Sequence, residues 1–353
     1  MAHTAYGLVR PTVCFSLAGI GCRRYDGTSV IKADGGHGAG ESGTGSSERR
    51  TDAVRAVAGA IFALIAIGLA SYAIYRERGS FAEALKSIGA FSVVASFLCG
   101  LIGVAATFPV WREVLHGLGV EMSWALGSRV FFVSQLGKYV PGSVWPVIMQ
   151  MEAGKARGAS RRTMLAANLI TLAMGCCIGL LIACVFLPGY DASALAHYWW
   201  VLFALPFLLA VLHPRALPGL LDRVFVLVHR PPLNERLEVR SAARASCWSV
   251  VSWAGLGLQL GILTNGVDHR GASAFLLSIG AVALAVPLGV LFIPAPAGAG
   301  IRDVVLVLVL TVILTPGQAL AVVVASRVLL IGCDLSLAGL SMIARRWMAV
   351  PAG

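Results

Sequence analysis

The chain contains long runs of apolar residues, and most of them approach the roughly twenty residues that an α-helix needs to cross a bilayer core of about 30 Å. These runs occupy residues 53–75, 88–110, 164–187, 198–212, 245–264, 274–293 and 319–343. A backbone in hydrocarbon must satisfy its N–H and C=O groups within its own segment, so these runs are expected to be helices. With a shorter run at residues 304–314, they predict an all-α, polytopic transmembrane bundle of about eight helices.

Composition argues against the main alternative, a set of soluble domains. Hydrophobic residues make up 58% of the chain and charged residues only 13%, which leaves too few polar side chains for solvated surfaces. The formal net charge is +11, but the basic residues lie between the apolar runs and do not form a single patch. We therefore expect no nucleic-acid partner.

The basic residues predict the orientation of the bundle. They gather at residues 49–55, 152–162 and 214–244, and Arg345 and Arg346 follow the last apolar run. Short loops rich in Lys and Arg stay on the cytoplasmic side. The sequence therefore predicts a multi-pass protein of the cell membrane with a cytoplasmic C-terminus.

The remaining connections are predicted to lie on the extracytoplasmic side of the membrane. Residues 188–197 and 265–271 contain a single basic residue, Arg270. The connection at residues 76–86 fits this scheme less well, because it carries Arg76, Arg78 and Lys86 but follows the first predicted helix.

The ends of the chain differ from the middle. Residues 37–50 are rich in Gly and Ser and cannot bury enough apolar surface to fold. We expect residues 1–50 to be a disordered polar tail, residues 51–347 the integral membrane domain, and residues 348–353 a short C-terminal tail. His and Cys residues are too scattered for a zinc site and no nucleotide-binding motif is present, so we expect neither metal nor cofactor.

One segment looks helical but is interrupted. Residues 123–151 form two short apolar arms, and the tip between them carries helix breakers and polar residues: Gly137, Lys138, Tyr139, Pro141 and Gly142, with Trp145 starting the second arm. Neither arm is long enough to span the bilayer alone. The pattern predicts a re-entrant hairpin, which is tolerated at membrane depth where protein or a wet cavity surrounds it.

A second break separates the run at 274–293 from the short run at 304–314, and it contains Pro296, Gly298 and Gly300. Two Gly- and Pro-interrupted segments, one in each half of the chain, indicate a transporter site at the interface of structural repeats. A pair of interfacial loops is the alternative. It is less favoured, because a loop in water needs no apolar arms.

Ionisable residues in or beside membrane segments usually pair or line a wet path. Three cations, Lys138, Arg302 and Arg327, are candidates to bind a lipid headgroup through its phosphate. The acidic residues that would balance their charge are Asp303, Asp334 and Glu152.

Structural roles compete with these assignments. Lys138 and Arg302 would then be topology anchors whose long side chains extend to the lipid headgroups. Arg327 and Asp334 would belong to a static network that locks the last helix to its neighbours. Glu152 borders a basic loop, and a surface role is favoured for it.

The two broken segments also carry a family resemblance. Gly137-Lys-Tyr-Val-Pro-Gly-Ser-Val-Trp145 resembles the GKYxPGxxW signature of the lysylphosphatidylglycerol synthase transmembrane region family, which includes the flippase half of the multiple peptide resistance factor. Gly300-Ile-Arg-Asp303 resembles the family's Gly-hydrophobic-Arg-Glu turn, with Asp303 in place of Glu. Arg327 falls where the family tends to place an arginine. The resemblance implies a protein that moves, or helps move, a membrane phospholipid or other lipid-linked substrate between leaflets.

Two other functional classes stay open. A membrane-embedded glycosyl or lipid transferase would need catalytic carboxylates outside the membrane near the first helices, where only Glu77 and Glu83 are available. A small-solute carrier, or a scaffold that transports nothing, would need no headgroup-sized groove open to the bilayer. We expect no enzymatic activity, because the short tail after the last helix has no room for an aminoacyl-transferring domain. The sequence does not predict the oligomeric state.

Overall fold

The computed structural model describes residues 68, 72, 75–139, 145–155, 158–189, 204–213, 216–227, 237–291 and 300–348. The predicted tail at 1–50, most of the run at 53–75, and Pro141, Gly142, Pro296 and Gly298 lie outside these residues. The chain divides into residues 1–48 and 49–353, and all the elements below belong to the second unit. Within the described residues every regular element is a helix and no strand occurs.

Five of the described helices are long and apolar enough to cross a membrane. They are α3 (Ala90–Gly117), α6 (Arg161–Gly189), α10 (Val239–Asp268), α11 (Ala272–Leu291) and α13 (Pro316–Met348). The predicted all-α, polytopic membrane bundle is confirmed. Two shorter helices, α8 (Ala204–Val211) and α9 (Ala216–Leu227), lie between α6 and α10 in the chain.

The helices extend beyond the apolar runs into residues that the sequence placed in loops. Arg161 and Arg162 belong to α6, and Arg240 and Arg244 lie in the first turns of α10. The connection at 76–86 likewise contains α2 (Arg78–Ser87). Hydropathy misses these turns, because a helix continues its backbone hydrogen bonds into the headgroup region while long basic side chains reach water.

α3 and α10 make the most extensive helix–helix contact of the described structure. Their backbones touch at Gly103 and Gly255, where a Cβ on Gly255 would lie 2.6 Å from the Gly103 Cα. Ser252 Oγ donates to the Gly103 carbonyl at 2.8 Å, and Ser96 Oγ donates to the Gln259 carbonyl at 2.8 Å. Small residues permit this close approach between membrane helices. We call these five residues the α3–α10 seam.

The interrupted segment after α3 folds back on itself. It consists of α4 (Trp124–Gln135), the 3-10 helix η1 (Leu136–Tyr139) and α5 (Trp145–Lys155). α4 and α5 pack against each other, and a Cβ on Gly137 would lie 2.9 Å from the Trp145 Cβ. Arms of 12 and 11 residues are each too short to cross the bilayer. The segment is therefore a re-entrant hairpin.

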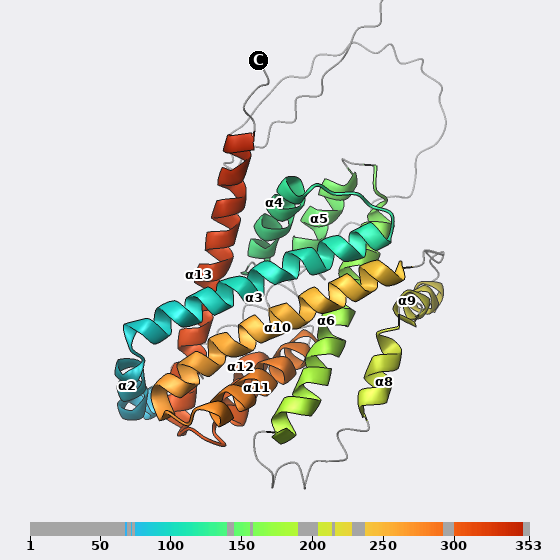
Figure 1. Ribbon diagram of the computed structural model, residues 1–353. Coiled ribbons are helices and arrows are strands. Elements are labelled where there is room, and N and C mark those ends of the chain that lie inside the picture. The colour runs from blue at the N-terminus through green and yellow to red at the C-terminus, as the bar shows by residue number, and fades with distance from the viewer. Residues whose placement is uncertain are drawn as a thin grey trace, which may run out of the picture. The chain divides into compact units, whose positions relative to one another are not determined.

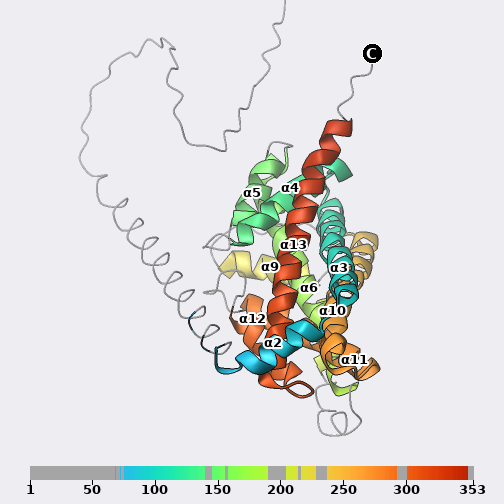
Figure 2. The same cartoon turned by 90° about the vertical axis from the view of Figure 1, so that its left-hand side faces the viewer.

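The second interruption leads into α12 (Ile301–Leu310), which packs against α11 and α13. Gly300 starts this helix with φ of 93°, a conformation that glycine adopts without steric cost. Figures 1 and 2 show α4 and α5 beside the C-terminal half of α13, and α12 and α2 beside its N-terminal half. The hairpin therefore approaches the middle of α13 from the C-terminal half of that helix, and α12 approaches it from the N-terminal half.

Candidate functional site

The middle of α13 carries two charged residues, Arg327 and Asp334. They are seven positions apart, so they share one face of the helix and are separated by roughly 10 Å along its axis. The tip of the hairpin, η1, contacts α13, and so does α12. Each brings charged side chains to this face.

The hairpin tip is joined to Asp334. Lys138 Nζ lies 2.7 Å from Asp334 Oδ2, and the Tyr139 hydroxyl donates to the same oxygen at 2.5 Å. The Asp334 side chain is only 4% exposed. A carboxylate at such a position needs compensating charge and hydrogen bonds, and η1 supplies both from adjacent residues.

The start of α12 is joined to Arg327. Arg327 donates from Nε to Asp303 Oδ1 at 2.7 Å and from Nη2 to Asp303 Oδ2 at 2.9 Å. This two-point geometry is the strongest that a guanidinium and a carboxylate can form. The Gly300 N–H also donates to Asp303 Oδ2, at 3.3 Å. The aspartate, shorter than the glutamate of the family signature, is therefore long enough to reach this arginine.

Arg302 differs from the other two cations. Its Nε is buried and has no hydrogen-bond partner, and no ion pair to it occurs among the described residues. Arginine keeps its charge in proteins, and an unpaired buried charge is costly. Three cations against two carboxylates, Asp303 and Asp334, leave a net charge of 3 − 2 = +1 at the site.

The three cations and Asp334 line a cavity of about 220 Å³. Its polar lining consists of Thr107, Gln135, Lys138, Tyr139, Arg302, Arg327 and Asp334. Its apolar lining comes from Val104, Leu256, Val286, Leu330 and Ile331. All three predicted headgroup cations therefore face one space, which combines an excess of positive charge with an apolar wall. We call it the central cavity.

The other predicted site residues fall into three groups. Glu152 pairs with Arg161 on the exposed surface of α5 and α6 and does not line the central cavity, so it does not balance the charge there. Trp145 packs against Gly137 at the neck of the hairpin. The remaining motif residues, Pro141, Gly142, Pro296 and Gly298, lie outside the described residues.

Sequence reasoning missed two polar residues of the cavity wall. Thr107 of α3 and Gln135 of α4 line the central cavity, yet neither stands in a recognisable motif. Gln135 could have been found from the sequence, because it is a polar residue directly before the hairpin tip. The hydrogen bond of Tyr139 to Asp334 could not, because it joins residues far apart in the chain.

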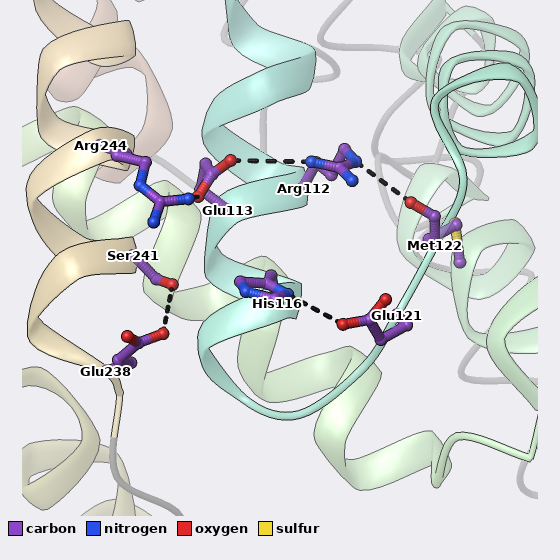
Figure 3. Close-up of polar contacts among 8 residues, drawn as sticks. All are labelled: Arg112, Glu113, His116, Glu121, Met122, Glu238, Ser241 and Arg244. Atoms are coloured by element: carbon purple, nitrogen blue, oxygen red, sulfur yellow. Dashed lines mark hydrogen bonds and ion pairs between the residues drawn. The ribbon is translucent and has the colours of Figure 1, made fainter.

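A second charged cluster ties the base of the hairpin to the α3–α10 pair (Figure 3). Arg244 Nη1 lies 3.3 Å from Glu113 Oε2, and Arg112 Nη1 lies 3.7 Å from Glu113 Oε1. Arg112 also donates from Nε to the Met122 carbonyl at 3.1 Å. Its Cζ lies 4.6 Å from the centroid of the Trp124 ring, in a cation–π contact. Contacts thus run from α10 through α3 to the start of α4, and they fix where the hairpin begins.

Comparison with known families agrees with the two motifs. The family model described as Lysylphosphatidylglycerol synthase TM region matches residues 55–332. This range includes the hairpin, α12 and Arg327, and it ends two positions before Asp334. No curated protein matches the chain. A match over most of the chain, together with the membrane helices, shows that this multi-pass membrane protein belongs to the lysylphosphatidylglycerol synthase transmembrane region family.

Proposed function

We propose that this protein translocates, or assists the translocation of, a phospholipid or other lipid-linked substrate between the leaflets of the cell membrane. The observation that carries the proposal is Arg302, a half-buried cation whose buried Nε has no partner among the described residues, at a cavity beside the middle of a membrane-spanning helix. The phosphate of a lipid headgroup would supply the anionic partner that Arg302 does not have among the described residues. A charge-assisted pair in such a low-dielectric site is far stronger than the same pair in water.

The mixed lining of the central cavity favours a lipid over a free anion. Leu256 and Val286 belong to the apolar part of the cavity lining, and this part suits the glycerol and first methylene groups next to the phosphate. Asp303 and Asp334 are each engaged by a cation. They suit charge balance better than the acid–base work that a transferase needs, so we propose transport without catalysis.

Lipid movement in proteoliposomes tests the proposal. The purified protein is reconstituted with fluorescently labelled phosphatidylglycerol, and the fraction that external dithionite quenches over time reports exchange between leaflets. Loss of one charge-assisted contact, worth about 1.5–3 kcal/mol, predicts a roughly 10- to 100-fold slower exchange for Arg302→Gln if that contact is lost at the rate-limiting step. Arg161→Gln removes an arginine that pairs on the surface, and it should keep the wild-type rate.

The same vesicles separate the alternatives. Equal rates in wild-type and protein-free vesicles would refute translocation of this lipid class. Uptake of radiolabelled glycerol phosphate without lipid exchange would identify a solute carrier instead. Wild-type exchange in Arg302→Gln would remove this arginine from the substrate site.

We also propose that the end of the bundle carrying Glu238 and Arg244 faces the cytoplasm, since basic residues concentrate there. Glu121, which is exposed on the α3–α4 connection, lies at this end (Figure 3). Helix α11 starts at the opposite end (Figure 1), and its first residue, Ala272, is exposed. In a cysteine-free background, Ala272→Cys should react with an impermeant maleimide in intact cells. Glu121→Cys should react only after permeabilisation, and the reverse pattern would invert the topology.

A further inference from the structure

The ion pair between Lys138 and Asp334 joins two side chains that differ in solvent exposure and in conformational freedom. The Lys138 side chain is 32% exposed, whereas that of Asp334 is 4% exposed. The ammonium ends a flexible four-carbon stem, but the carboxylate projects from the middle of a 33-residue helix. Lys138 can therefore turn toward an anion in the central cavity while Asp334 keeps its place.

Few other charges face Asp334. η1 contributes Lys138 and Tyr139, and α12 contributes Arg302 and Asp303, of which Asp303 already holds Arg327. On α13 itself, Cys333 directly precedes Asp334, and Arg327 lies about two turns earlier on the same face. Among the described residues, no further cation is available to replace Lys138.

The other elements packed against α13 present uncharged residues to the cavity. These are Val104 and Thr107 on α3, Gln135 on α4 and Leu256 on α10. α2 meets α13 near its start, where Ser80 lies against Gly317, about 25 Å along the helix from Asp334.

Building on the proposed function, we propose that Asp334 is a proton-binding site linked to anion binding in the central cavity. A phosphodiester has two free oxygens, one for Arg302 and one for Lys138, and both cations line the same space. When Lys138 turns to the phosphate, Asp334 retains only the Tyr139 hydroxyl. A proton then leaves a hydronium ion and bonds to the carboxylate, because an ionised buried carboxylate without a cation is strongly disfavoured.

The link is reciprocal. If anion binding promotes proton uptake, proton uptake must strengthen anion binding by the same factor. Affinity for the anion should therefore rise as pH falls. A translocation step built on this site would carry a proton with each lipid.

Titration calorimetry on the full-length protein in an uncharged detergent tests the link. The probe is dihexanoylphosphatidylglycerol, whose phosphodiester stays ionised throughout. Measurements at one pH in two buffers with different heats of ionisation give the protons exchanged on binding. We expect uptake of about one proton per bound probe at most, and a dissociation constant that rises by up to about tenfold per pH unit.

Variants assign the proton to Asp334. Asp334→Asn mimics the protonated carboxylate, so it should bind the probe with no proton uptake and no pH dependence. Lys138→Gln removes the exchanging cation, and it should bind more weakly and also without proton uptake. Glu152→Gln alters a carboxylate that pairs with Arg161 outside the cavity, and it should retain the wild-type proton number.

The outcomes separate this inference from the proposed function. Probe binding without proton uptake in the wild type would overturn the link but leave the anion site intact. Full uptake in a folded Asp334→Asn protein, or in Lys138→Gln if the first variant does not fold, would overturn the assignment. Absence of probe binding to the folded wild type would overturn both proposals.

Discussion

The α3–α10 seam and the central cavity lie next to each other, but they accommodate polar groups within the membrane differently. At the seam no charge is present, and the serine hydroxyls are satisfied by backbone carbonyls, although the Gln259 side-chain nitrogen is unpaired. At the cavity, ionised side chains meet, and the buried Nε of Arg302 has no partner in the described part of the chain.

Two residues of the cavity wall connect these regions. Val104 and Leu256 line the cavity, and each directly follows a seam glycine, Gly103 or Gly255. This part of the wall is therefore held by the most extensive helix–helix contact in the described structure, whereas the 3-10 turn η1 and the short helix α12 supply Lys138 and Arg302. We therefore expect the α3–α10 pair to act as a fixed scaffold, and any rearrangement to occur in the charged, interrupted elements.

The largest effect is expected where backbones touch. Gly255→Ala would place a Cβ only 2.6 Å from the Gly103 Cα. Overpacking costs about 1–3 kcal/mol and occasionally more, and we expect at least the upper end because backbone atoms cannot move aside. Thermal unfolding in detergent measures this loss.

Gly175→Ala is the matched control for that change. A Cβ at Gly175, also within a membrane helix, would meet nothing within 4 Å. Its melting temperature should stay near the wild-type value. Equal losses in both variants would show that the seam is not specially packed.

The second-largest loss of stability is expected when the ion pair between Arg327 and Asp303 is broken. Arg327→Gln leaves Asp303 without its two-point partner, and because both side chains are partly exposed we expect about 1–3 kcal/mol of destabilisation, below the cost at a fully buried pair. Adding Asp303→Asn should restore part of the stability, as a double-mutant cycle would measure. A stable Arg327→Gln protein with slowed lipid movement would instead place Arg327 at the substrate.

Arg302→Gln should have the opposite effect on stability. Removing an unpaired buried charge should leave the melting temperature unchanged, or raise stability by up to about 1 kcal/mol, even as lipid exchange slows. The melting temperature and the rate of lipid exchange are measured on one purified sample. A fall in stability as large as that of Arg327→Gln would mean that Arg302 has a structural partner.

The smallest effect is expected for a single hydrogen bond of the seam. Ser252→Ala removes the donor to the Gly103 carbonyl, and such bonds between membrane helices average about 0.6 kcal/mol. Lipid exchange should be unchanged. A large loss of exchange would contradict the division into scaffold and site.

Much of this architecture is predictable from the sequence. Apolar runs define most of the membrane helices, because a bilayer of fixed thickness demands their length. Gly137 and Gly300 mark the two interruptions, and Lys138, Arg302 and Arg327 stand out as charges in apolar surroundings. All three line the central cavity.

The partnerships are not predictable from local pattern. Asp334 pairs with Lys138, 196 positions earlier in the chain, and Arg327 pairs with Asp303 of a different helix. These contacts depend on how the two short elements pack against α13. The same holds for Glu152, whose surface pair with Arg161 depends on the packing of α5 against α6.

The central claim is that Arg302 holds a lipid phosphate, and native mass spectrometry of the purified protein tests it most directly. The wild type and Arg161→Gln should each retain a co-purified lipid that carries phosphate. Arg302→Gln, folded and equally stable, should lose it. Equal lipid occupancy in all three proteins would contradict the claim.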